Sequence, residues 1–92
     1  MKIAIVSGYF NPLHVGHLDY MEAAKALADK LIVIVNSDYQ VTLKGSTPFM
    51  READRIRIIN SLKTVDKVYL STDRDESVLE TLKYIVVQNQ AC

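Results

Sequence analysis

Apolar residues along this chain form two patterns, short continuous runs and repeats at helical spacing. The continuous runs are rich in β-branched residues, which is typical of strands buried on both faces of a parallel sheet. They occupy residues 3–6, 31–35 and 68–70. The segments that follow them favour helices, because they combine helix-forming residues with apolar positions three and four apart. These predicted helices span residues 16–28, 50–62 and 76–84.

Strands that alternate with helices through short links predict βαβ units with right-handed crossovers. We therefore expect one α/β domain over residues 1–92, built on an open, doubly wound parallel sheet. The polar stretch 38–49 is expected to be a loop, with one helical turn at most, and it is long enough to suggest a function. Residues 85–87 should begin a fourth strand, and since the chain ends five residues later, we expect an incomplete domain.

Charge and cysteine content narrow the function classes. Eleven basic and eleven acidic residues give zero net charge, which argues against a general nucleic-acid or membrane-surface binder but leaves room for a local anion pocket. The single cysteine, Cys92, excludes an intramolecular disulfide and favours a reducing compartment. No apolar stretch approaches the roughly 20 residues that span a bilayer. We expect a soluble, cytoplasmic protein.

The candidate chemistry follows the first strand. Gly8 allows a sharp turn that delivers the chain to a helix N-terminus, where free amides and the helix dipole favour phosphate. His14 and His17, the only two histidines, are three residues apart and should point the same way at the helix entrance. Gly16, between them, leaves space for phosphate oxygens against the main chain.

Other interpretations of this turn compete with phosphate binding. A lone histidine at a helix start is more often a cap or a packed ring, and the pairing of two is what favours a site. Zinc is disfavoured because no third ligand of the usual type lies nearby. Gly8 and Gly16 do not have the spacing of the dinucleotide fingerprint G-x-G-x-x-G, and the chain has no Walker-type G-K-[ST].

Residues 8–17, G-Y-F-N-P-L-H-V-G-H, resemble the G-x-F-[DN]-x-x-H-x-G-H signature of the cytidylyltransferase-like nucleotidyltransferases. This superfamily includes glycerol-3-phosphate cytidylyltransferase, the adenylyltransferase domain of ADP-heptose synthase and nicotinate-nucleotide adenylyltransferases. The resemblance extends over roughly residues 1–83 and implies their Rossmann-like fold. It continues through residues 35–38, 43–45, 54–55 and 65–68.

The resemblance also implies roles for individual residues. His14 and His17 match histidines that contact the triphosphate and stabilise charge at the α-phosphorus, and Lys44 matches a lysine that reaches the phosphates. Arg55 matches an arginine that orders the second helix and the subunit contact, so a homodimer is expected. The full set of expected nucleotide-binding residues is Gly8, Tyr9, Phe10, Asn11, His14, Val15, Gly16, His17 and Lys44.

Asp38 and Asp66 also lie in matching segments, with function and simple turn or cap duties equally open. The implied reaction is attack by an acceptor phosphate on the α-phosphorus of a nucleoside triphosphate, with Mg²⁺ and without metal ligands from protein side chains. CTP with glycerol 3-phosphate is placed slightly ahead of ATP with a sugar phosphate or nicotinate mononucleotide.

Two departures from the family pattern keep alternatives open. Asn11 stands where an aspartate is commonest in the glycerol-phosphate and heptose branches, so the base and the acceptor are undecided. The later G-[DG]-D turn, arginine and S-[ST]-[ST]-x-[IL] segment of the family have no match. A non-catalytic nucleotide-binding remnant is therefore the alternative to an enzyme.

Overall fold

A parallel sheet forms the centre of the computed structural model, which describes residues 2–90. Its strands are β1 (Ile3–Gly8), β2 (Lys30–Val35) and β3 (Lys67–Leu70). They lie in the order β1-β2-β3, and each is parallel to its neighbour, so β2 is the central strand. The carboxyl ends of all three strands therefore lie at the same end of the sheet, where open parallel sheets bind their ligands.

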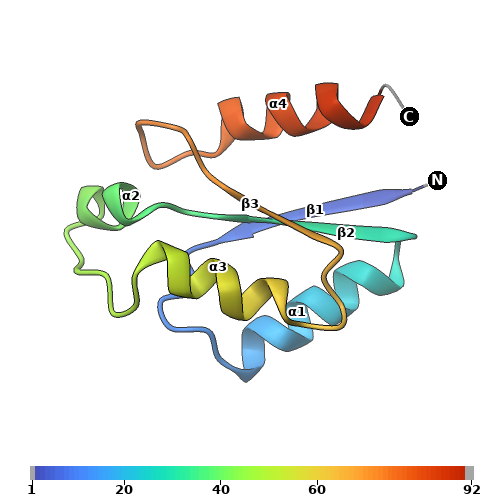
Figure 1. The fold of residues 1–92 in the computed structure, drawn as a ribbon, viewed down its shortest axis with the longest axis horizontal. Helices are drawn as coiled ribbons and strands as arrows, with labels where there is room; N and C mark the ends of the chain where they lie inside the picture. The colour runs from blue at the N-terminus through green and yellow to red at the C-terminus, as the bar shows by residue number, and fades with distance from the viewer. Residues whose placement is uncertain (1, 91–92) are drawn as a thin grey trace.

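The helices lie on both faces of this sheet. In the described residues 2–90 they are α1 (Val15–Ala26), α2 (Asp38–Leu43), α3 (Glu52–Asn60) and α4 (Leu79–Gln90). Figure 1 shows α1 and α3 together on one face and α4 alone on the other, with α2 at the carboxyl end of β2. The expected open, doubly wound parallel fold is confirmed. Within this part of the chain no helix is both long and apolar enough to cross a membrane.

Strand β2 supplies the middle of the core. All five residues from 31 to 35 are at most 1% exposed, as their continuous apolar run predicts. The odd-numbered side chains pack toward α1 and α3, where they meet Met21 and Ile59. The even-numbered side chains, on the opposite face, pack with Ile85 of α4. Burial on both faces explains why this strand shows no alternation of polar and apolar residues.

The prediction of a fourth strand at residues 85–87 is wrong, because these residues lie inside α4. Ile85 is 0% exposed and belongs to the core cluster that Val78 and Leu82 also join. These three positions are spaced four and three residues apart, which places them on one face of a helix. Val86 and Val87 are exposed. The β-branched run therefore packs through a single residue, and packing overrides local strand propensity.

The polar stretch after β2 contains α2, in agreement with the one helical turn expected there. Ser37 caps this helix: its hydroxyl accepts the amide of Gln40, and the Gln40 side chain accepts the amide of Ser37. The fully buried Gln40 also donates to the carbonyls of Asp75 and Ser77 at 2.7 Å each. These bonds tie α2, whose C-cap is Lys44, to the loop after β3.

Candidate functional site

An open pocket of about 420 Å³ lies beside the carboxyl end of β1. The loop after β1, the first turn of α1, and α2 with the turn that follows it form its walls. Its lining residues are Tyr9, Phe10, Asn11, Pro12, His14, His17, Val41, Lys44 and Ser46. Gly8, Val15 and Gly16, which the sequence placed at the ligand, are outside this lining. The structure thus brings together both histidines and the lysine that the sequence singled out.

Both histidines cap α1. The His14 Nδ1 accepts the amide of Gly16 at 3.0 Å, and the His17 Nδ1 accepts the amide of His14 at 3.0 Å. The two rings stack with centroids 3.9 Å apart and an interplanar angle of 29°. The capping interpretation and the pocket interpretation therefore apply to the same rings. One expectation changes, because the Gly16 amide bonds to the His14 ring and is not free for a phosphate.

These bonds fix the tautomer of each neutral ring. Since Nδ1 accepts a backbone amide, the proton of a neutral imidazole lies on Nε2, which is then a donor. The pKa of His17 is lowered from its ordinary value, first by burial and second by the charge of the neighbouring His14. His17 is therefore neutral at pH 7 and can donate one hydrogen bond from Nε2.

Both glycines make room for an aromatic side chain. A Cβ on Gly16 would lie 2.8 Å from the Cε1 of His14, so this glycine makes room for the imidazole. A Cβ on Gly8 would lie 2.8 Å from the tip of the Phe10 ring. Gly8 has no need of an unusual backbone conformation, because it ends β1 as an ordinary strand residue. In both cases an aromatic side chain takes the space that the missing Cβ leaves.

Phe10 holds the loop after β1 in its shape. Its φ of 51° lies in the left-handed region, which costs a non-glycine residue about 1–3 kcal/mol. Burial offsets this strain, because the side chain is 2% exposed and packs in the main core cluster. The ring also meets His17 edge-on, with centroids 5.0 Å apart. Phe10 therefore connects the core directly to one of the two pocket histidines.

Lys44 lies at the C-cap of α2 and lines the same pocket as the histidines. Its ammonium is 4.2 Å from the centroid of the Tyr9 ring, which is a cation–π distance. The pKa of Tyr9 is raised, first by burial and second by the charge of Glu76, so the phenol stays neutral. Within residues 2–90 no carboxylate pairs with this ammonium, so its donors can bind an anionic ligand.

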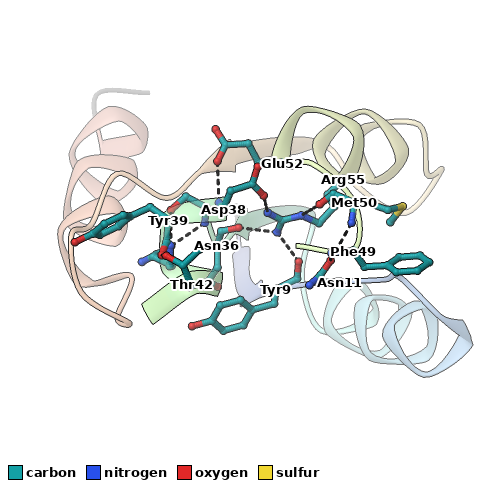
Figure 2. A network of polar contacts seen from close by, with 12 residues as sticks. Tyr9, Asn11, Asn36, Asp38, Tyr39, Thr42, Phe49, Met50, Glu52 and Arg55 are labelled. Atoms are coloured by element: carbon teal, nitrogen blue, oxygen red, sulfur yellow. Dashed lines mark hydrogen bonds and ion pairs between the residues drawn. The ribbon is translucent and has the colours of Figure 1, made fainter. Parts of the chain in front are cut away.

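Arg55 joins the residues that directly follow β1 and β2 (Figure 2). The residue is 1% exposed, and its guanidinium donates to the carbonyls of Tyr9 and Asn36 at 2.7 Å each. It also donates to the carbonyl of Met50 and forms a 2.6 Å ion pair with Asp38. The sequence assigned Arg55 to helix ordering and to a subunit contact. Within this chain its guanidinium is enclosed, and the subunit contact stays a prediction.

The two aspartates left open by the sequence have structural contacts. Asp38 begins α2, and besides pairing with Arg55 it accepts the amide of Glu52, whose side chain accepts the amide of Asp38. Asp66 accepts the amide of Leu31 and pairs with Lys25, at the amino end of β2. Neither aspartate lines the pocket.

The sequence did not single out four contributors to this site. Three of them line the pocket, namely Pro12, Val41 and Ser46. The fourth is Gln40, which anchors α2 to the loop after β3. Val41 and Ser46 lie within three residues of Lys44 in the chain. A helical turn that ends at this lysine would have predicted that they lie near the same pocket.

Comparisons with known proteins agree with this geometry. Residues 5–90 match the cytidylyltransferase-like family. This chain belongs to that family. The FAD synthase of Methanosarcina barkeri (strain Fusaro / DSM 804) is 40% identical over 85 residues, which cover 92% of this chain and 59% of the relative. The bifunctional protein HldE of Methylobacillus flagellatus is 42% identical over 71 residues, which cover 75% of this chain and 14% of the relative.

A solved structure of the same fold extends the comparison. The lipopolysaccharide core biosynthesis protein of Thermoplasma volcanium GSS1 superposes with a TM-score of 0.84 at 30% identity, over 92% of this chain and 68% of that protein. This cytidylyltransferase-like chain spans about 59% of the length of the FAD synthase it matches. Family membership, signature and pocket thus agree over nearly the whole chain.

Proposed function

We propose that this chain is the nucleotide-binding part of an adenylyltransferase, which transfers AMP from ATP to the phosphate of a small acceptor and releases pyrophosphate. The observation that carries the proposal is that the stacked pair His14 and His17 lines the same open pocket as Lys44. The names of the relatives favour the adenylyl alternative over cytidylyl transfer to glycerol 3-phosphate. FAD, the product named in FAD synthase, contains an adenylyl group joined to the phosphate of FMN.

The proposed step is a direct displacement. An acceptor phosphate oxygen forms a bond to the α-phosphorus of ATP, and the bond from that phosphorus to the oxygen that bridges to the β-phosphorus breaks. Such transfers depend on positioning and on charge stabilisation, and not on a covalent intermediate. In this site the Nε2 protons of His14 and His17 and the ammonium of Lys44 are the available donors. Each would bind the negative charge that develops on the phosphate oxygens.

Mg²⁺ enters this proposal as part of the ATP substrate. Magnesium prefers carboxylate and phosphate oxygens, and among the described residues that line the pocket none is Asp or Glu. The side chains present therefore fit a metal held mainly by the triphosphate, where it neutralises phosphate charge. The residues of the chain itself would bind the remaining phosphate oxygens.

The test measures binding and turnover separately. Calorimetry with MgATP and with MgCTP should show tighter binding of ATP. Pyrophosphate release should then be measured with ATP and an acceptor panel of FMN, a sugar phosphate and glycerol 3-phosphate. We expect His14→Ala to lower the rate by about 10²–10³-fold. Asn60→Ala, at the exposed end of α3, is the matched control.

The outcomes distinguish the alternatives. Triphosphate binding without turnover against any acceptor would favour the non-catalytic nucleotide-binding module. Tighter binding of CTP than of ATP would favour cytidylyl transfer over adenylyl transfer. Failure to bind either triphosphate would refute the proposed function.

A further inference from the structure

The side chain of Asn11 connects the loop after β1 to the segment that follows α2. Its Oδ1 accepts the amide of Phe49 at 2.6 Å and the amide of Met50 at 3.1 Å. Its Nδ2 donates to the carbonyl of Thr47 at 3.3 Å. Figure 2 shows the Asn11 amide pointing at the backbone of Phe49 and Met50. These contacts join residues 36 to 39 positions apart in the chain.

The segment that Asn11 contacts has little packing of its own. The side chain of Phe49 is 74% exposed, and the five residues from 43 to 47 are also exposed. Burial of apolar surface therefore contributes little to holding this segment. The same segment carries Lys44 and Ser46, both of which line the pocket. A hydrogen-bonded anchor at its far end thus bears directly on where these two residues lie.

An asparagine suits this position because its amide both donates and accepts. A carboxylate could accept the two amides but could not donate to the Thr47 carbonyl. It would also add negative charge to the pocket wall, since Asn11 itself lines the pocket. The neutral amide therefore anchors the segment without repelling an anionic ligand.

We propose that Asn11 is a positioning residue: through Thr47, Phe49 and Met50 it holds the 44–50 segment so that Lys44 stays within reach of the triphosphate. The identity of the ligand rests on the proposed function. The role of Asn11 as an anchor rests only on its hydrogen bonds. It makes the affinity contributed by Lys44 depend on a side chain that Lys44 does not contact.

The anchor is tested first in the protein without ligand. Hydrogen exchange of the Phe49 and Met50 amides should be roughly tenfold or more faster in Asn11→Ala, since a backbone amide that loses its acceptor becomes open to water. Asn11→Asp keeps both acceptor contacts and should keep most of the protection. Asn60→Ala is the control and should exchange like the parent protein. Parent-like exchange of both amides in a folded Asn11→Ala would overturn the proposal.

The link to Lys44 is tested with a double-mutant cycle on MgATP affinity. Lys44→Ala should raise Kd about tenfold in the parent protein, as for the loss of a charged hydrogen bond. In the Asn11→Ala background the same change should have a clearly smaller effect, whereas in the Asn60→Ala background it should keep its full effect. Asn11→Asp should weaken MgATP binding although its exchange stays slow. Strict additivity between Asn11 and Lys44 would refute the positioning role.

The two proposals fail in different ways. If the parent protein binds no triphosphate, the proposed function and the Lys44 part of this inference are both wrong. The exchange rates of the free protein still decide whether Asn11 holds the segment. If the protein binds ATP but the cycle is additive, the proposed function stands and the positioning role does not. Should Asn11→Ala unfold, Asn11→Ser replaces it in both measurements, because the shorter side chain also takes the acceptor away from the two amides.

Discussion

Gly16→Ala separates the stability of the fold from the geometry of the pocket. An added Cβ would lie 2.8 Å from Cε1 and 3.1 Å from Nδ1 of His14. Carbon atoms prefer separations of about 3.5–4.0 Å, so the imidazole must move away. It would then lose the 3.0 Å hydrogen bond from the amide of residue 16 and its stacking against His17.

The expected effect on stability is small because two terms oppose one another. Loss of the side-chain cap on α1 costs about 0.5–2 kcal/mol. Alanine in place of glycine at a helical position returns about 0.4–1 kcal/mol. The free energy of unfolding should therefore change by about 1 kcal/mol or less. Turnover should fall much further, by about 10²–10³-fold, because the proposed function makes His14 a donor to the triphosphate and its ring is no longer in place.

Urea unfolding and MgATP turnover should be measured on the same preparations. Asp19→Ala, an exposed position in the same helix, controls for a general effect of changing α1. Parent-like turnover in Gly16→Ala would refute the role of the His14 ring position. Loss of several kcal/mol in stability would show that the backbone, and not the imidazole, yields to the new Cβ.

Three further predictions concern the fold around the site. Arg55→Met should lower the free energy of unfolding by about 3–5 kcal/mol in a denaturant titration, because Asp38 loses a buried ion-pair partner and three carbonyls lose their donor. A change below 1 kcal/mol would contradict a stabilising role for the Arg55 contacts. Burial raises the pKa of Asp73, but hydrogen bonds from Thr81, Glu80 and Ser71 outweigh it and hold that pKa below its ordinary value. The stability that this carboxylate contributes is present above pH of about 3.9 and is lost as the pH falls through the folded pKa. Asp73→Asn should therefore lose less stability than the parent protein between pH 7 and pH 3. An equal loss in both proteins would contradict this role of Asp73. Ile85→Ala should cost about 2–5 kcal/mol, and the exposed Val87→Ala about 0.5 kcal/mol or less, whereas a strand would place both side chains on one face. Equal losses at both positions would count against α4.

Local patterns predicted much of the architecture. Five consecutive apolar residues in β2 predicted burial on both faces, and the structure confirms it. The spacing of His14 and His17 predicted a shared direction at the entrance of α1, where the rings stack. The same kind of reasoning failed at residues 85–87. Three β-branched residues favour a strand locally, but here a helix can pack one of them against a face of the sheet. The contact of Ile85 with Ile32 and Ile34 supplied that face.

What the sequence by itself determined is the order of elements and the residue types at the entrance of α1, since both depend on neighbours within a few positions. What only the tertiary structure decided is how the loops are held. Arg55 reaches carbonyls 46 and 19 residues away, and Asn11 reaches amides 38 and 39 residues away. Hydrogen bonds depend on distance and angle in space, which no local pattern of residues encodes. For the same reason the sequence could identify Gly16, but only the position of the His14 ring explains why a glycine is needed there.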